Sequence, residues 1–525
     1  MTKGYMGKIL RVNLSKGTVV EEDLRGEWAR KFIGGAGLAT KYLYDEIVSG
    51  VDPLGSQNKL IFMTGPLTGT SSASAGRYSV VAKSPLTGIW GHGNSGGSFG
   101  PAMKRSGYDG IIIEGASNKP VYLKVVDGQA ELCEASELWG KKVPDADDII
   151  RQESDQNLVV AVIGPGGENM VRYAAIMNNK HRAVGRCGLG AVMGSKQLKA
   201  IACGGKATVE LMDPHTFREV AKKQIDLLNE SILKVAFEAF GTNMVSDMVN
   251  IRGGYPTRNW QRGVFDDIDE VNGQGLTDAV FVKGLNCFAC PISCGRATEI
   301  REGEWAGHSG EGPEYESTNT LGAMCGVSDM NAITMANYLC NEYGLDTISA
   351  GSSIAFAMEC YEKNILTKKD TGGVELKFGD AELVVDLISK IANREGIGDL
   401  LAEGTKAMSE KLGHGSEHFA MHVKGLELPA YDPRAAKITG LGYVTANRGG
   451  DHITAYVQGP TFIDAPFLLV DDSTIKDPFV ANPEEVKVVV DLENALTVFD
   501  CIGACKFMGI LLPAEAYQLC YRLGF

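Results

Sequence analysis

The sequence predicts an α+β protein of several domains, in which a β-rich N-terminal part precedes two mainly helical parts. A chain of 525 residues is too long for a single hydrophobic core. Up to about residue 208 it consists of short β-type runs broken by glycine and proline, and from Met212 onward helical patterns dominate. We therefore predict domains at 1–208, 209–424 and 425–525.

The strands of the N-terminal part are predicted from alternating or fully apolar runs. Residues 8–14 alternate, turn at Ser15-Lys16-Gly17 and continue as a second run at 18–21, which predicts a hairpin. The dipeptide Asp127-Gly128 predicts another hairpin turn. The remaining predicted strands are 60–63, 78–82, 110–114, 121–126, 130–133 and 158–163.

The first helix is predicted from its capping residues. Asp213 is a suitable N-cap and Pro214 a suitable first helical residue, and an amphipathic pattern follows to residue 228. Further helical patterns cover 329–343, 352–363, 381–392 and 400–412. Residues 425–433 resemble a loop, which predicts the second boundary.

Composition and charge exclude several classes of function. Lys and Arg number 51 against 65 Asp and Glu, a net charge of −14, so neither nucleic acid nor an anionic membrane surface is an expected partner. No run of about 18 apolar residues could span a membrane, and no targeting segment is visible. Twelve cysteines in so long a chain do not indicate a disulfide framework. We expect a cytoplasmic protein.

A cysteine motif predicts a metal centre. The run Cys-Phe-Ala-Cys-Pro-Ile-Ser-Cys places Cys287, Cys290 and Cys294 on one tight loop, and Cys505 is a candidate fourth thiolate. Three thiolates from one loop and one remote thiolate are typical of a cubane 4Fe-4S cluster. The alternative is structural zinc, because four thiolates also suit that metal. Zinc motifs more often come as two Cys-x2-Cys pairs, so the spacing favours iron–sulfur.

Glycine-rich segments predict sites for anionic groups. Glycine contributes 65 of the 525 residues, well above the usual share of about 7%. Segments 76–78, 94–97 and 181–196 combine glycine turns with polar or basic side chains, a combination that phosphate and pyrophosphate groups require. None is a P-loop or a dinucleotide fingerprint. Each alone is more often a tight turn, but their number beside the cysteine motif favours a bound cofactor.

Together these segments resemble a known family. The chain is similar to the tungsten-containing aldehyde ferredoxin oxidoreductases from about residue 7 to residue 505, at consistent spacing. The segments that carry the resemblance are 64–70, 76–78, 94–97, 182–196, the cysteine loop, 311–316, 344–346, 428–434, 447–452 and 500–505. Family members continue well beyond Cys505, so the resemblance implies an incomplete C-terminal domain, in either a fragment or a shortened homologue.

The resemblance implies a tungsten bound by the dithiolene sulfurs of two pyranopterins (tungstopterin), with no protein ligand to the metal. The β-rich domain would be the platform for this cofactor. By family position, Arg77 would lie between a pterin and the 4Fe-4S cluster, which Cys287, Cys290, Cys294 and Cys505 would hold. Asn94 and the backbone carbonyl of Ala183 would bind the magnesium ion (Mg2+) that bridges the two pterin phosphates, and Arg182 would line the same site. Magnesium prefers such oxygen ligands.

Two short patterns would contact the pterins, and both depart from the family. The matching residues are Asn341, Gly344, Leu345 and Asp346 in the first pattern, and Asp500, Gly503 and Ala504 in the second. Asn341 stands where relatives have Asp, and Ala504 where they usually have Leu. In many relatives a Glu-x-x-His pair binds a metal between two subunits, and Met335 and Tyr338 stand at these positions here. The sequence therefore does not decide whether the protein forms a homodimer.

The implied reaction is oxidation of a small aldehyde to a carboxylic acid, with electrons passing through the cluster to ferredoxin or a ferredoxin-like subunit. Glu316 would be the general base and His452 a donor to the substrate oxygen. Glu311 and Glu314 lie close to Glu316 in sequence. Two alternatives remain: other low-potential chemistry, such as ring reduction of an aromatic thioester, and a non-catalytic electron-transfer or scaffold protein.

Overall fold

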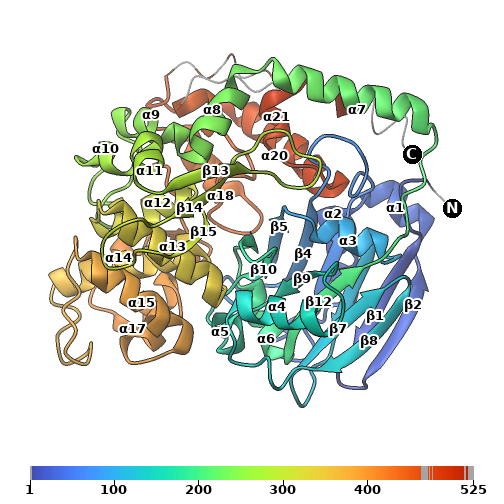
Figure 1. The fold of residues 1–525 in the computed structure, drawn as a ribbon. Helices are drawn as coiled ribbons and strands as arrows, with labels where there is room; N and C mark the ends of the chain where they lie inside the picture. The colour runs from blue at the N-terminus through green and yellow to red at the C-terminus, as the bar shows by residue number, and fades with distance from the viewer. Residues whose placement is uncertain are drawn as a thin grey trace.

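The computed structural model describes residues 3–462, 471, 473, 475, 477–513 and 516–517. Its N-terminal part contains two six-stranded sheets (Figure 1), with strand orders β2-β1-β6-β3-β4-β5 and β11-β10-β9-β12-β7-β8. The strands of the first are β1 (Lys8–Asn13), β2 (Thr18–Asp23), β3 (Leu60–Thr64), β4 (Tyr78–Lys83), β5 (Trp90–Ser95) and β6 (Gly110–Glu114). Those of the second are β7 (Val121–Val126), β8 (Gln129–Glu134), β9 (Val159–Val162), β10 (Ile176–Asn178), β11 (Arg182–Val184) and β12 (Leu198–Gly204).

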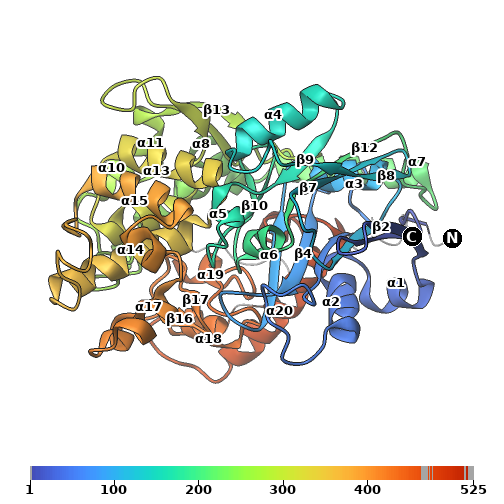
Figure 2. The same ribbon diagram turned by 90° about the horizontal axis from the view of Figure 1, so that it is seen from below.

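The two sheets share one hydrophobic core, and helices cover their outer faces (Figure 2). The helices of this part, some on the outer faces and some between the sheets, are α1 (Gly26–Phe32), α2 (Gly35–Glu46), α3 (Phe99–Arg105), α4 (Val143–Glu153), α5 (Pro165–Glu168) and α6 (Leu189–Ser195). Side chains of α3 and α6 fill the shared core. On the outer faces, Tyr42 of α2 packs on the first sheet and Ile150 of α4 on the second. The β-rich part is therefore a layered platform.

The next part of the chain is mainly helical and has its own core. Its helices are α7 (Pro214–Asn229), α8 (Ile232–Phe240), α9 (Ser246–Ile251), α10 (Ile268–Val271), α11 (Gly273–Ala279), α12 (Tyr315–Leu321), α13 (Met330–Tyr343), α14 (Thr347–Glu362), α15 (Ala381–Asn393), α16 (Ile397–Leu401) and α17 (Thr405–Leu412). A small sheet of β13 (Phe281–Leu285), β14 (Gly295–Glu299) and β15 (Ser309–Glu311) lies beside them. The cysteine loop connects β13 to β14.

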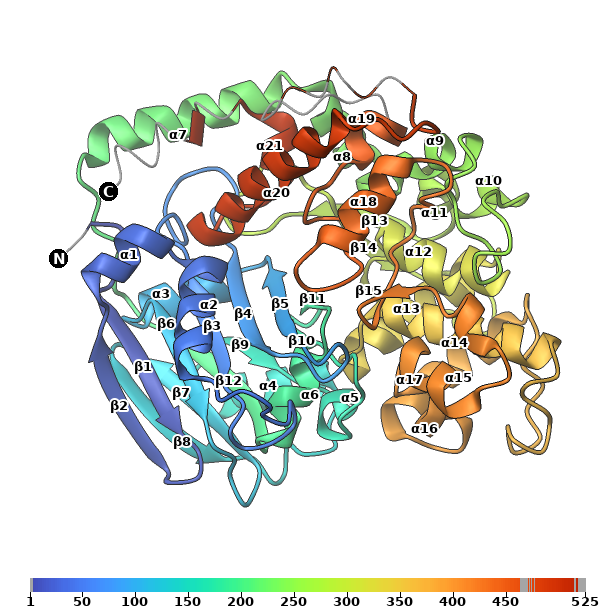
Figure 3. The same ribbon diagram turned by 180° about the vertical axis from the view of Figure 1, so that it is seen from behind.

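The last part of the chain returns to the first sheet. It contains β16 (His422–Val423), β17 (Leu426–Glu427), α18 (Lys437–Thr445), α19 (Gln458–Phe462), α20 (Glu485–Ile502) and α21 (Met508–Leu511). Helix α20 lies against α2 and β4 (Figure 3). The approach is so close that a side chain on Gly35 would come 1.9 Å from the carbonyl oxygen of Asp500. This packing brings Cys505 to the platform.

Most predicted elements are confirmed, with some corrections. The hairpin of β1 and β2 forms, and Asp213 caps α7 by accepting from the backbone N–H groups of His215 and Thr216. The single helix predicted at 400–412 is wrong: Gly404, at φ +84°, separates α16 from α17. The loop predicted at 425–433 contains the short strand β17. Within the described ranges, every helix is too short or too polar to cross a membrane.

Candidate functional site

The four predicted thiols surround one small cavity. Cys287, Cys290 and Cys294 come from the loop between β13 and β14, and Cys505 follows α20. All four line a cavity of about 10 Å³ together with Arg77 and other residues of the platform. The loop is tied to the platform by the backbone N–H of Ser74, which donates to the carbonyl of Ala289 (2.7 Å). The structure thus brings together the cysteines that the sequence predicted.

The four thiols lie around one space, an arrangement that a 4Fe-4S cluster also has. Among the described residues, no group of three or more His, Cys, Asp or Glu side chains converges to hold one ion. The thiols instead surround a space, as the corners of a cubane require. A side chain on Gly96 would come 2.8 Å from the Cys287 sulfur, so the platform backbone lies directly against the cavity. Burial raises the pKa of the Cys290 and Cys294 thiols, so metal charge is needed to ionise them.

Arg77 lies between the thiols and the rest of the candidate site. Its Nη2 donates to the Cys505 sulfur and its Nη1 to Asn94 Oδ1, each at 3.2 Å. Arg77, Gly96 and Cys287 line both the thiol cavity and a second cavity of about 290 Å³. These shared walls make the two cavities direct neighbours. A group bound in the second cavity would therefore be separated from the thiols by one layer of side chains.

The second cavity, which we call the Arg182 cavity, collects most residues of the first predicted pterin pattern. It is lined by Arg182, Ala183, Asn341, Leu345 and Asp346, among others, whereas Gly344 ends α13 outside the lining. Arg182 pairs with Glu311 (2.9 Å). Asn341 donates from Nδ2 to the backbone carbonyl of Glu311 (3.3 Å). Asn341 therefore stabilises the carbonyl beside the arginine, a contact that an ionised aspartate at this position could not donate.

A third, larger cavity contains the other predicted carboxylate. It measures about 960 Å³ and is lined by Asn94, Asp500 and Lys506, among others. Asp500 pairs with Lys506 (2.8 Å). The neighbours of Asp500 in the pattern lie elsewhere: Gly503 ends α20 in a left-handed conformation, and Ala504 is buried in an apolar cluster. Neither lines a described cavity, so of this second pattern only Asp500 is placed beside one.

The fourth cavity, which we call the aromatic cavity, brings together Glu316 and His452. Its volume is about 190 Å³. Glu316, in the first turn of α12, accepts from the backbone N–H of Ala430 at Oε2 (2.8 Å), and its Oε1 lies 3.5 Å from His452 Nε2. Glu316 Oε1 and His452 Nδ1 are buried without a hydrogen-bond partner. Burial raises the pKa of Glu316 to about 8 and lowers that of His452 to about 3.

The structure separates the three carboxylates of the acidic segment. Glu311 pairs with Arg182, and Glu314 accepts from the Thr242 hydroxyl (2.6 Å). Glu316 is the one that faces a histidine and has a buried oxygen without a partner. Glu314 and Glu316 line both the aromatic cavity and the Arg182 cavity, so these two residues belong to the wall between the two. This placement lets Glu316 act on a molecule in either space.

Unpartnered polar atoms in these cavities indicate where a ligand would bind. His181 Nδ1 and Asn94 Nδ2 are buried and have no hydrogen-bond partner, and His181 lines the Arg182 cavity. Buried polar groups are normally satisfied, so such atoms are expected to face a bound group. The donor set of arginine, histidine and asparagine suits a phosphorylated pterin. The residues present therefore fit the cofactor that the sequence implied.

Several neighbouring residues were missed by the sequence prediction. His181 and Arg186 belong to the predicted anion-binding segment, but nothing in the motif distinguished them from its other polar residues. Arg186 pairs with Asp346 (3.2 Å). Arg448 pairs with Asp451 (2.7 Å) through an Arg-x-x-Asp spacing, a signal that could have indicated the pair.

The chain is similar to known proteins over nearly its whole length. The family profile described as "Aldehyde ferredoxin oxidoreductase, N-terminal domain" matches residues 9–205, and "Aldehyde ferredoxin oxidoreductase, domains 2 & 3" matches residues 219–523. A tungsten-containing aldehyde ferredoxin oxidoreductase from Pyrococcus abyssi is 45% identical over 521 residues, covering 98% of this chain and 84% of the relative. The WOR-like subunit of an aliphatic sulfonate oxidoreductase from Pyrococcus furiosus is 33% identical, covering 94% of this chain and 82% of that protein.

A solved structure shows the same architecture. The active-site complex BamBC of benzoyl coenzyme A reductase, in complex with 1,5-dienoyl-CoA, superposes with a TM-score of 0.86 at 26% identity. The superposition covers 100% of this chain and 86% of that chain. The layered platform and the helical parts are therefore a shared arrangement.

Proposed function

Because this chain belongs to the aldehyde ferredoxin oxidoreductase family, an oxidoreductase family, we propose that it oxidises an aldehyde at a bis-pyranopterin tungsten centre. The reaction is RCHO plus water giving RCOOH, two protons and two electrons. The electrons would leave one at a time through a 4Fe-4S cluster held by the four cysteines, toward ferredoxin. The observation that supports this best is the Glu316–His452 pair, which lies on the wall of the Arg182 cavity, itself beside the thiols.

The residues proposed to hold the cofactor come from all parts of the chain. Arg182 and His181 would bind phosphate, Asn94 and the carbonyl of Ala183 a magnesium ion, and Asp346 and Asp500 the pterin N–H groups. When bound, the tungsten centre supplies an acceptor for both electrons and a Lewis acid that polarises a carbonyl. Arg77 would lie between this centre and the cluster, a role that its contacts with Cys505 and Asn94 support.

Glu316 and His452 are proposed to handle the protons. A pKa of about 8 places Glu316 near the working pH, which a general base requires. Its free Oε1 accepts a proton from water or from the hydrated aldehyde. His452, with a pKa of about 3, is neutral at pH 7 and keeps one ring N–H to donate to the substrate oxygen. The hydrogen bond strengthens as negative charge develops on that oxygen.

The walls of the aromatic cavity favour an apolar aldehyde. Its lining includes Leu233, Phe237, Met244, Val245, Tyr315, Tyr431, Ile453, Tyr456, Phe507 and Ile510. Glu314 and Glu316 lie on the same walls, and no lysine or arginine lines them among the described residues. An anionic substrate would find no cation on the described part of these walls to neutralise it. A sulfonate or phosphorylated aldehyde is therefore disfavoured.

Metal analysis and a substrate series test this proposal. Protein purified without oxygen should contain tungsten and about four irons per chain, as a single cubane requires. It should reduce viologen with acetaldehyde or benzaldehyde as the electron donor. The anionic aldehyde glyceraldehyde 3-phosphate should support a much slower reduction. Iron without tungsten would instead indicate an electron-transfer or scaffold protein. Tungsten with activity on a benzoyl thioester but not on aldehydes would indicate ring reduction.

Loss of Arg182 should remove the pterin cofactor before it removes the cluster. Arg182→Ala deletes the proposed phosphate donor and leaves Glu311 without its partner, whereas the thiol cavity is lined by other residues. We expect tungsten and pterin content to fall well below wild type while iron stays near four per chain, measured by mass spectrometry. Lys180→Ala is the matched control, because Lys180 lies two residues before Arg182 in the chain and pairs with Asp148 instead of Glu311. Full tungsten content in Arg182→Ala would contradict the phosphate assignment.

A further inference from the structure

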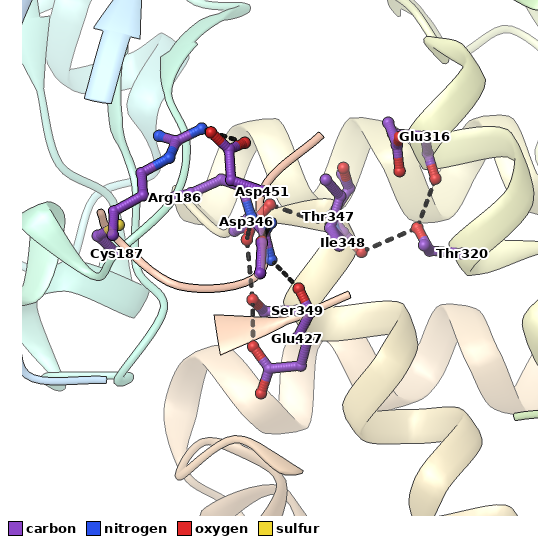
Figure 4. Close-up of polar contacts among 12 residues, drawn as sticks. Arg186, Cys187, Glu316, Thr320, Asp346, Thr347, Ile348, Ser349, Glu427 and Asp451 are labelled. Atoms are coloured by element: carbon purple, nitrogen blue, oxygen red, sulfur yellow. Dashed lines mark hydrogen bonds and ion pairs between the residues drawn. The ribbon is translucent and has the colours of Figure 1, made fainter. Parts of the chain in front are cut away.

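Asp346 is the centre of a buried polar network (Figure 4). It precedes α14, and its Oδ1 accepts from the backbone N–H of Ile348 (3.1 Å). Its Oδ2 accepts from Arg186 Nε (3.2 Å) and lies 2.8 Å from the Ser349 hydroxyl oxygen. A carboxylate has about four acceptor sites, so these three contacts leave one for a ligand. Asp346 lines the Arg182 cavity, which is where that ligand would lie.

Glu427 approaches the same hydroxyl from the other side. It ends β17 and is 0% exposed. Its Oε2 lies 2.7 Å from the Ser349 hydroxyl oxygen, while its Oε1 accepts from the backbone N–H (2.9 Å) and hydroxyl (3.1 Å) of Thr405. Arg186 donates to the backbone carbonyl of Glu427 (2.6 Å) but bonds the side chain of Asp346. The side chain of Glu427 therefore has neutral donors, whereas Asp346 has a cation.

One hydroxyl hydrogen cannot serve two ionised carboxylates. Ser349 has a single O–H, yet a carboxyl oxygen of Asp346 and one of Glu427 both lie within hydrogen-bond distance of it. If both were ionised, one would face the lone pairs of the hydroxyl oxygen, an unfavourable contact in a buried site. A proton on one of the two carboxyls resolves the conflict, because that carboxyl then donates to Ser349.

The surroundings decide which carboxyl carries the proton. Asp346 has the Arg186 guanidinium as a buried counter-charge at 3.2 Å, whereas the side chain of Glu427 is bonded only by neutral donors. Burial raises the pKa of Glu427, and the hydrogen bonds from Thr405 and Ser349 together with the charge of Arg186 offset this only in part. We infer that Glu427 is a neutral carboxylic acid that donates to Ser349, and that Ser349 in turn holds Asp346 as the charged acceptor for a pterin N–H. Glu427 is thus a positioning residue, and it acts through two hydrogen bonds rather than by touching the cofactor.

The contact from Asp346 to a pterin rests on the proposed function, whereas the proton on Glu427 does not. This separates the two in an experiment. Glu427→Gln and Asp346→Asn are a matched pair, because each replaces one carboxyl oxygen by an amide nitrogen of similar size. A glutamine can donate to Ser349 and accept from Thr405, as the acid does. An asparagine at 346 leaves the Arg186 cation buried without its counter-charge.

The inference predicts opposite outcomes for the two variants. Glu427→Gln should keep a thermal midpoint close to wild type and load tungsten and pterin normally. Asp346→Asn should lower the midpoint and reduce loading by about 10- to 100-fold, the usual cost of losing a supporting partner at a metal site. In the cofactor-free protein, the wild type minus Glu427→Gln infrared difference spectrum should show a protonated-carboxyl band that shifts in heavy water.

Each contrary result has a distinct meaning. Unfolding or poor loading of Glu427→Gln, or absence of the infrared band, would overturn the inference. Tolerance of Asp346→Asn together with damage in Glu427→Gln would place the proton on Asp346 instead. If the infrared band is present but Asp346→Asn loads fully, the protonation stands and the pterin contact of the proposed function is wrong.

Discussion

Glu316→Gln should lower aldehyde turnover by about 10²- to 10⁴-fold, the usual cost of losing a positioned acid or base. The amide keeps the size of the side chain and can still contact Ala430 and His452, but it cannot take up a proton. Tungsten and iron content should stay at wild-type values, because neither proposed metal centre uses this carboxylate. Viologen reduction with benzaldehyde measures the loss, and mass spectrometry checks the metals.

The pH profile and a neighbouring carboxylate provide the controls. Because a base must be ionised, wild-type kcat/KM should rise as the pH increases through about 8, the value to which burial raises the pKa of Glu316. The residual activity of Glu316→Gln should lack this rise. Glu314→Gln should be much milder, since Glu314 already accepts from Thr242. A collapse in Glu314→Gln with wild-type rates in Glu316→Gln would show that the base was assigned to the wrong residue.

Cys505→Ala should abolish electron transfer to ferredoxin, because it removes one corner of the proposed cubane and the sulfur that Arg77 contacts. We expect loss of the 4Fe-4S electron paramagnetic resonance signal on reduction, with iron falling well below four per chain. Alanine at Cys287, Cys290 or Cys294 should have the same effect.

Cys501→Ala is the matched control for the cluster. Cys501 lies four residues before Cys505 in the chain, near the end of α20, but it is buried against Gly37 and does not line the thiol cavity. The signal should therefore remain in this variant. A zinc content of one per chain after anaerobic expression and reconstitution would contradict the cluster, and the proposed electron path with it.

Local chemistry was enough to predict many elements of the fold. The N-cap at Asp213 and the alternation at 8–14 each give a pattern that tertiary contacts do not change. Strands β5 and β10–β12 were not predicted. β5 reads Trp-Gly-His-Gly-Asn-Ser, whose glycines disfavour a strand, but pairing with β4 overrides that propensity. β12 is buried at every position, so it shows no alternation.

The sequence by itself determined the cysteine loop and the family motifs, because a chelating loop and a glycine turn depend on spacing over a few residues. Only the tertiary structure decided which acidic residue faces His452, because Glu311, Glu314 and Glu316 share one segment and differ only in what packs against them. The same holds for Arg77 between Cys505 and Asn94, and for Ser349 between two carboxyls. These contacts join residues far apart in the chain. Burial then sets the protonation of the carboxyl groups in these contacts, because a carboxyl removed from water is charged only where a cation or enough hydrogen-bond donors stabilise it.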